Sequence, residues 1–435
     1  MPGQPYMLDP AVEAMPRPRL RQMQDLRLRA VVQRCYQNMG MYREKFDQIG
    51  LKPDEVRSVE DLPRLPFTTK EDLRSRYPLK GLLAVPRSEV QRFHMTTGTT
   101  GKPTISPLTR DDVFRAEEAL ARCGAAAGVG PGDVAQLMFG YGLFAGSVIC
   151  HPAWERMLGA AVIPAGAALP SATQLDIMQE FRPTVLAATP SFLLHIVEVA
   201  REHKVPIAEL GVQKIVTGAE PSSEETRLKI AQAFHAPIYS DIYGMCELGP
   251  HFCVECPDHQ GLHINEDCFL AEIIDPETGQ QLPPGQKGML VLTCLMKQAM
   301  PLLRYQTKDI TVLEDAPCSC GRSHVRVRRI MGRTDDMVKV KGVNIFPSQV
   351  EAVIRGVEEV KDSEFQMLVD RSLAAVDSLT VKVEAARPGP ELVAKLKAEF
   401  SRAFLGSNLK VELVPVGSLP RFSHKAKRLV DTRQL

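Results

Sequence analysis

The stretch from residue 95 to residue 104, MTTGTTGKPT, combines hydroxyl side chains with two glycines and a lysine. These residue types suit the oxygens of a triphosphate, because glycines let the backbone approach an anion and lysine supplies positive charge. A Walker A loop would need glycine in place of Thr96 and a hydroxyl residue in place of Pro103. The stretch therefore predicts a phosphate-binding loop of another type, with an ordinary surface loop as the alternative.

Length and charge limit the classes of function. A chain of 435 residues is expected to form two or three domains. The 53 Lys and Arg against 52 Asp and Glu give a formal charge of +1, which argues against nucleic acid or a membrane and favours a small-molecule partner. We find no apolar run that could span a bilayer and no signal-peptide order in MPGQPYMLDP, so we expect a soluble cytoplasmic protein. Homodimerisation is left open.

The hydrophobic period changes along the chain and predicts an α/β fold. Helical spacing covers residues 17–46, and short helices broken by proline are expected over residues 54–77. Over residues 134–212, β-rich segments such as VAQLMF and PTVLAAT alternate with helical ones, which is typical of a parallel or mixed sheet covered by helices. After residue 261, AEIID and GMLVLTCL predict a β-rich subdomain.

The last hundred residues show a different mixture. Strand-like VKVKGVNIF, LTVKVEA and KVELV alternate with helices expected at residues 348–354 and 390–404. We therefore expect a large N-terminal domain, residues 1–334, and a small C-terminal α+β domain, residues 335–435.

Four further motifs lie in order with the opening loop: GAEP at residues 218–221, DIYGMCELG at 241–249, LLRYQTKD at 302–309 and GRTDDMVKVKGVNIFPSQVE at 332–351. Together they resemble the acyl-adenylate-forming superfamily, most closely its phenylacetate-CoA ligase branch. KFDQIG, LPFTTKEDLR, GYGLF, GLHINED and LPRFSHKAKR support this branch, so the resemblance extends from about residue 26 to the C-terminus. It implies that ATP activates a carboxylic acid as acyl-AMP, releasing pyrophosphate, and that coenzyme A then forms the thioester.

The resemblance implies nucleotide-binding roles. The loop would hold the β- and γ-phosphates through Thr96, Thr97, Gly98, Thr99, Thr100, Gly101 and Lys102. A second group would bind the adenosine and α-phosphate: Gly218, Ala219, Glu220, Asp241, Tyr243, Asp309 and Arg333. In this group Tyr243 would face adenine, and Asp309 would accept the ribose hydroxyls. Glu247 would bind Mg²⁺, because a hard cation prefers carboxylate oxygens.

The resemblance also implies catalytic roles. Lys425, in SHKAKR, would bridge the carboxylate and the α-phosphate, and would act with Lys102 and Glu247. Asp335 would be the hinge about which the small domain rotates between the two half-reactions. Four residues depart from the family pattern: Thr97, Cys246, Gln306 and His424. Of these, Cys246 replaces a hydroxyl near the phosphates by a weaker thiol donor.

The acid pocket should be apolar, because an arylacetate offers little beyond a ring and a carboxylate. In the family, GYGLF lies against the aryl group, which assigns Tyr141 and Phe144 to the substrate, with Met245 nearby. The alternative is that both aromatic residues belong to the core. We expect a phenylacetate-like aromatic acid as the substrate.

Two closely spaced pairs of cysteines indicate a metal site. Cys253 and Cys256 form C-x-x-C, and Cys318 and Cys320 form C-x-C in PCSCGRSH. Such pairs suit a tetrahedral structural Zn²⁺, and the ten cysteines of a cytoplasmic protein are otherwise expected to be reduced thiols. Three histidines could replace one cysteine: His251, His259 and His324. Four free cysteines are the alternative.

The leading hypothesis is an AMP-forming aryl or arylacetate–CoA ligase that uses ATP, Mg²⁺ and coenzyme A. A ligase that attaches AMP to a deazaflavin cofactor has similar sequences and needs no coenzyme A. A non-catalytic sensor that binds the acid or the nucleotide would keep the fold, and Cys246 is the residue that favours it.

Overall fold

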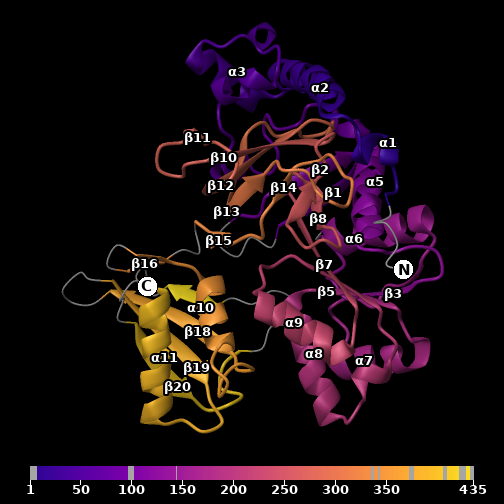
Figure 1. Ribbon diagram of the computed structural model, residues 1–435. Coiled ribbons are helices and arrows are strands. Elements are labelled where there is room, and N and C mark those ends of the chain that lie inside the picture. Colours follow the sequence, from indigo (N-terminus) through magenta and orange to yellow (C-terminus); the bar gives the residue numbers. More distant parts are fainter. Residues whose placement is uncertain are drawn as a thin grey trace.

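The computed structural model describes residues 7–96, 102–143, 145–334, 338–340, 343–371, 377–404, 409–420 and 428–431. Figure 1 shows a large body formed by the N-terminal part and a smaller C-terminal unit at its lower left. This mixed α/β architecture confirms the predicted fold class. The predicted domain boundary and hinge at Asp335 lie outside the described residues, so they stay predictions.

One 13-stranded sheet runs through the large body in the order β11-β10-β12-β13-β14-β9-β8-β7-β6-β5-β3-β4, with β15 paired to β13. The part from β7 to β4 is parallel, and the other pairs are antiparallel. The parallel strands are β3 (Val134–Leu137), β4 (Ala161–Ile163), β5 (Val185–Ala188), β6 (Lys214–Gly218) and β7 (Ile238–Met245). The others are β8 (Gly249–Glu255), β9 (Leu262–Ile264), β10 (Phe269–Ile274), β11 (Gln281–Leu282), β12 (Lys287–Cys294), β13 (Tyr305–Glu314), β14 (Arg326–Val327) and β15 (Gly332–Arg333).

Helices cover both faces of the parallel part, as predicted. Alternation along β5 sends Val185 and Ala187 toward α5 (Arg110–Ala126) and α6 (Ala145–Pro152). Leu186 and Ala188 pack instead in the cluster built on α7 (Ser171–Phe181), α8 (Pro190–Glu202) and α9 (Glu224–Phe234). Because both faces are buried, β5 is the continuous apolar run VLAA.

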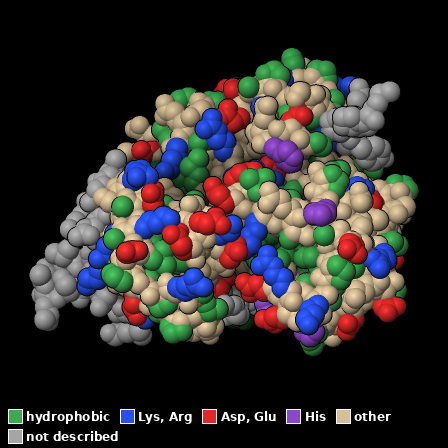
Figure 2. Space-filling view, turned by 60° about the horizontal axis from the view of Figure 1, so that its bottom comes forward, with side chains coloured by type: hydrophobic (Ala, Val, Ile, Leu, Met, Phe, Trp, Pro, Cys, Tyr) green, Lys and Arg blue, Asp and Glu red, His purple; other side chains and the backbone are tan. Residues whose placement is uncertain are grey.

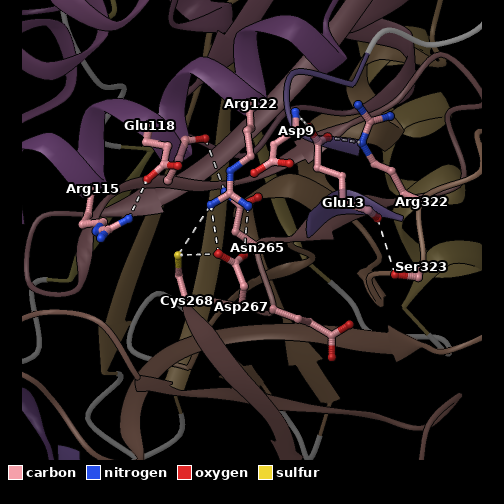
Figure 3. A network of polar contacts seen from close by, with 12 residues as sticks. Asp9, Glu13, Arg115, Glu118, Arg122, Asn265, Asp267, Cys268, Arg322 and Ser323 are labelled. Atoms are coloured by element: carbon pink, nitrogen blue, oxygen red, sulfur yellow. Dashed lines mark hydrogen bonds and ion pairs between the residues drawn. The ribbon is translucent and has the colours of Figure 1, made fainter. Parts of the chain in front are cut away.

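The N-terminal helices pack on the antiparallel part, at the top of Figure 1. The helices here are α1 (Pro10–Glu13), α2 (Arg17–Asn38) and α3 (Gly40–Ile49), followed by the 3₁₀ turns Pro53–Glu55 and Val59–Arg64. Two ion pairs hold the start of these helices. Arg322 Nε donates to Glu13 Oε2 at 2.8 Å in a buried contact (Figure 3), and the half-exposed Arg17 pairs with Glu266.

The small C-terminal unit has its own core. Its sheet order is β20-β19-β18-β21, with α10 (Pro347–Arg355) and α11 (Pro390–Ala403) packed on it. The strands are β18 (Phe365–Arg371), β19 (Asp377–Glu384), β20 (Lys410–Val414) and β21 (Leu429–Asp431). VKVKGVNIF, predicted as one strand, forms two antiparallel strands, β16 (Val338–Val340) and β17 (Val343–Ile345), with Val340 opposite Val343.

Polar contacts join the small unit to the large body at α9. Thr226 Oγ1 donates to Glu351 Oε1 on α10 at 3.1 Å, and Lys229 forms an ion pair with Asp362. Figure 2 shows acidic and basic side chains interspersed on one face of the molecule, in keeping with the net charge of +1. Among the described residues, no helix is both long and apolar enough to cross a membrane.

Candidate active site and metal centre

The predicted phosphate loop connects two short antiparallel strands, β1 (Val90–Met95) and β2 (Ile105–Thr109). Two hydrogen bonds connect the two ends of the loop: Thr96 N donates to Thr104 O at 3.0 Å, and Thr104 N donates to Thr96 Oγ1 at 3.0 Å. Lys102 is exposed, and its Nζ lies 5.8 Å from the ring centroid of Tyr77. The other predicted loop residues lie outside the described part of the chain: Thr97, Gly98, Thr99, Thr100 and Gly101.

Glu247 lies beside the base of this loop and is only 5% exposed. Its Oε1 accepts a hydrogen bond from Thr104 Oγ1 at 2.9 Å and lies 3.6 Å from Lys70 Nζ. Lys70 is the first residue of α4 (Lys70–Arg74), which begins after a capping box of Thr69 with Asp72. Lys70 was not named as a site residue from the sequence. It belongs to the motif LPFTTKEDLR, which was used only to support the family resemblance.

Three residues predicted to bind the nucleoside form one hydrogen-bonded group. Tyr243 on β7 donates its hydroxyl to Asp309 Oδ2 at 2.6 Å, and Arg333 Nη1 lies 2.9 Å from Asp309 Oδ1. Burial, together with the charge of Asp309, raises the pKa of Tyr243 well above its ordinary value, so the phenol keeps its proton. The structure therefore brings Tyr243, Asp309 and Arg333 together.

The predicted adenine wall follows β6. A Cβ on Gly218 would lie 2.6 Å from the carbonyl oxygen of Ile242, so this close approach of two strands requires glycine. Ala219 has a positive φ of 70°, and the Glu220 side chain accepts a hydrogen bond from Ser191 N at 2.7 Å. On the adjacent strand, burial raises the pKa of Asp241 to about 7.

These residues gather at one edge of the sheet. The parallel strands β3, β5, β6 and β7 end at Leu137, Ala188, Gly218 and Met245, and the carboxyl ends of parallel strands meet at the same edge. Open α/β sheets bind their ligands outside this edge. The strand order thus brings the end of β6, which carries the predicted adenine wall, to the same edge as the end of β7, which carries Tyr243 and precedes Glu247.

The predicted acid-binding residues are only partly described. Tyr141 is 39% exposed and meets His151 edge to face, with ring centroids 6.4 Å apart. Met245, at the end of β7, packs against the large core cluster. Phe144 lies outside the described residues. Lys425 and Asp335 do as well, so their roles stay predictions.

The cysteine pairs meet, with one correction. Cys256, Cys318, Cys320 and His263 are buried, and their candidate ligand atoms all lie within 4.8 Å of one another. Cys253 is instead fully buried in the main hydrophobic cluster. Its inclusion in the metal site was wrong, because residues three apart along a strand point to opposite faces and β8 runs through Glu255.

His263 on β9 takes the fourth position in the group, where Cys253 was predicted. Among the side chains described, none of the three histidines proposed as the fourth ligand lies there. His259 lies 3.5 Å from Glu255, and His324 contributes its carbonyl oxygen, which lies 3.0 Å from His263 Nδ1. The side chain of His251 lies outside the described residues. The motif GLHINED contained the signal for His263 but served only as support for the resemblance.

The geometry of the four ligand atoms suits a tetrahedral ion. Cys256 Sγ and Cys318 Sγ lie 3.7 Å apart, and Cys320 Sγ lies 3.3 Å from His263 Nε2. Tetrahedral zinc with Zn–S bonds of about 2.3 Å separates two sulfurs by about 3.8 Å. The hydrogen bond from Cys256, with His263 nearby, holds the pKa of the Cys320 thiol well below its ordinary value.

Comparison with known proteins identifies the family of the chain. Residues 42–294 match the model of the AMP-binding enzyme family, and residues 342–433 match that of the AMP-binding enzyme C-terminal domain. The chain is 41% identical to the phenylacetate-coenzyme A ligase of Thermus thermophilus, over 98% of this chain and 100% of that protein. It is 36% identical to the enzyme of the same name from Escherichia coli, over 98% of each.

Solved structures are similar over the whole chain. A 2-hydroxyisobutyryl-CoA ligase in the postadenylation state, bound to an acyl-AMP, has a TM-score of 0.91 at 28% identity, covering 100% of this chain and 94% of that one. The same ligase in the thioesterification state has a TM-score of 0.72 at 30% identity, covering 98% and 92%. The two parts of the present structure are therefore arranged as in the postadenylation state. By sequence and fold, this chain belongs to the phenylacetate-coenzyme A ligase family of AMP-forming acid–CoA ligases.

Proposed function

We propose that this protein, an adenylate-forming acid–CoA ligase, activates an aromatic acid of the phenylacetate class. The observation that carries the adenylation step is that Thr104 connects the phosphate loop to Glu247 at 2.9 Å, at the same sheet edge as Tyr243 and its partner Asp309. The names of the full-length relatives favour phenylacetate as the acid. A half-exposed tyrosine, Tyr141, after β3 suits the wall of a pocket for an aryl ring.

In the proposed reaction, the acid carboxylate attacks the α-phosphorus, pyrophosphate leaves, and the thiol of coenzyme A then displaces AMP. The phosphate loop and Lys102 would hold the β- and γ-phosphates, while Asp309 orients the ribose. Arg333 and Lys425 would offset the negative charge that develops as the two anions meet. Lys425 and the hinge at Asp335 enter this proposal through the family resemblance.

Glu247 fits the role of a magnesium ligand. Its carboxylate is buried beside the phosphate loop, and only one of its oxygens accepts the hydrogen bond of Thr104. A carboxylate shared with substrate phosphates is a usual setting for this hard cation. When bound, Mg²⁺ supplies positive charge to the phosphate oxygens.

Exchange of labelled pyrophosphate into ATP, measured with a panel of aromatic acids, tests the proposal. We expect exchange with arylacetates, and CoA-dependent conversion of the acyl-AMP to a thioester. Exchange with a deazaflavin cofactor and no thioester would favour the adenylyl-transferring alternative. No exchange with any acid would favour a sensor, for which Cys246 is the relevant departure: burial raises its pKa to about 12, so it stays a weak thiol donor.

We further propose that Cys256, His263, Cys318 and Cys320 bind a structural zinc ion. Three thiolates and one imidazole are a common closed ligand set for zinc. The contact of His263 Nδ1 with the carbonyl of His324 orients Nε2 toward the cysteines, as a backbone partner does at many zinc sites. The site joins the end of β8 to the loop before β14, so we expect it to stabilise the fold rather than to act in catalysis.

A further inference from the structure

We propose that Lys297 is a positioning residue that fixes the magnesium ligand Glu247 from the protein side. This inference rests on the proposed magnesium site. Lys297 follows β12 and is only 5% exposed. Its Nζ donates to the backbone carbonyl oxygen of Glu247 at 2.9 Å and to Ser106 Oγ at 2.7 Å.

These contacts attach Glu247 twice to the same strand. Thr104, just before β2, donates directly to the Glu247 carboxylate at 2.9 Å. Ser106, two residues later on β2, accepts a hydrogen bond from the Lys297 ammonium, which also donates to the backbone carbonyl of Glu247. A ligand held through both its side chain and its main chain loses little further freedom when it binds a cation. The strand that follows the phosphate loop therefore sets the position of Glu247.

Burying the charged side chain of Lys297 costs desolvation free energy, so its presence here calls for an explanation. Within the described part of the chain, both hydrogen-bond partners of Lys297 are neutral oxygens and no carboxylate lies at ion-pair distance. Burial lowers its pKa, against the opposing charge of Asp112. An apolar side chain of similar length would fill the space without this desolvation cost. The ammonium contacts the main chain of Glu247 rather than its carboxylate, and adds positive charge behind the phosphate site.

The test measures metal affinity rather than turnover. Mn²⁺, as a probe for Mg²⁺, is titrated into the full-length protein with a non-hydrolysable ATP analogue, and free Mn²⁺ is followed by electron paramagnetic resonance. Lys297→Met should weaken Mn²⁺ binding about tenfold, the size expected when a hydrogen bond from a charged group is lost. Binding of the acid should stay unchanged.

Lys214→Met is the matched control, because Lys214 is also largely buried but pairs with Asp133 at 2.7 Å, away from the phosphate loop. It should lower thermal stability without changing Mn²⁺ affinity. Mn²⁺ affinity within twofold of wild type in Lys297→Met would overturn the proposal and leave Lys297 a purely structural residue.

Ser106→Ala removes one hydrogen-bond partner of Lys297 and keeps the lysine itself. It therefore tests the proposal if Lys297→Met does not fold. We expect a loss of about two- to threefold in Mn²⁺ affinity, and no loss would overturn the proposal. Wild-type protein that binds the analogue yet takes up no Mn²⁺ beyond the nucleotide alone would overturn the magnesium assignment of Glu247 itself.

Discussion

The hydroxyl of Tyr243 donates to Oδ2 of Asp309 at 2.6 Å, so the residue proposed to face adenine also orients the carboxylate proposed to bind the ribose. Arg333 binds the other oxygen of Asp309 at 2.9 Å. Both oxygens of the Asp309 carboxylate are therefore held by residues of the predicted nucleoside site.

Tyr243→Phe should raise the KM for ATP about tenfold, because the ring is kept while a hydrogen bond to a charged group, about 1.5 kcal/mol, is lost. The KM for the acid should not change. Tyr36→Phe is the control, since Tyr36 donates to Asp47 at 3.0 Å on the surface. Pyrophosphate exchange measures both constants, and an unchanged KM for ATP in Tyr243→Phe would contradict the nucleoside assignment.

Cys318→Ser should lose about one equivalent of zinc and lower the melting temperature, because structural zinc contributes directly to folding free energy. Cys253→Ser should keep its zinc, since Cys253 lies in the apolar core, although its buried hydroxyl will also reduce stability. Elemental analysis of protein purified without chelators gives the zinc content. Wild-type protein without zinc, or equal loss in both variants, would refute the site.

Lys229→Met removes the ion pair with Asp362 that joins the two parts in their present arrangement. We expect adenylation to slow about two- to fivefold, because a partly exposed ion pair contributes at most about 1 kcal/mol. Thioester formation from supplied acyl-adenylate should not slow. Lys395→Met, which removes an ion pair within the small unit, is the control. Single-turnover assays separate the two steps, and equal slowing of both would argue against this role.

Asp241 should make stability depend on pH. Its pKa is raised from 3.8 to about 7 by burial, so the folded state binds more protons than the unfolded state between these values. The free energy of unfolding should therefore fall relative to Asp241→Asn as pH rises through this window, and level off above about 7. Denaturant unfolding at a series of pH values measures the difference. A difference that is constant with pH would show that Asp241 does not titrate there.

Tyr141→Ala should lower kcat/KM for aromatic acids about ten- to a hundredfold, since covering its half-exposed ring with the bound acid would contribute on the order of 1–3 kcal/mol. The KM for ATP should change little. Phe181→Ala, at an exposed position on α7, is the control for loss of an aromatic ring. Equal damage to the constants for ATP and acid would show that Tyr141 is structural.

Sequence alone predicted the fold class, and it named Tyr243, Asp309 and Arg333, which the structure brings together, as candidate nucleotide-binding residues. Tyr243 and Asp309 lie 66 positions apart but belong to motifs whose order the family keeps. The group of residues proposed to bind zinc was only partly predicted, because C-x-x-C spacing does not show that Cys253 faces the other side of β8. Lys297 could not be found, because its partner Ser106 lies 191 positions away and the contact depends on the packing of two strands.

The ion pair between Glu13 and Arg322 joins residues 309 positions apart in the sequence. A ribosome that adds ~5–20 residues per second needs roughly 15–60 s to cover that distance. For this time Glu13 of α1 lacks its partner Arg322, whereas α2 can already pack against α3 and the turns that follow it. The helix α1 is thus fixed late, and a chain released before residue 322 leaves it exposed to proteases and chaperones.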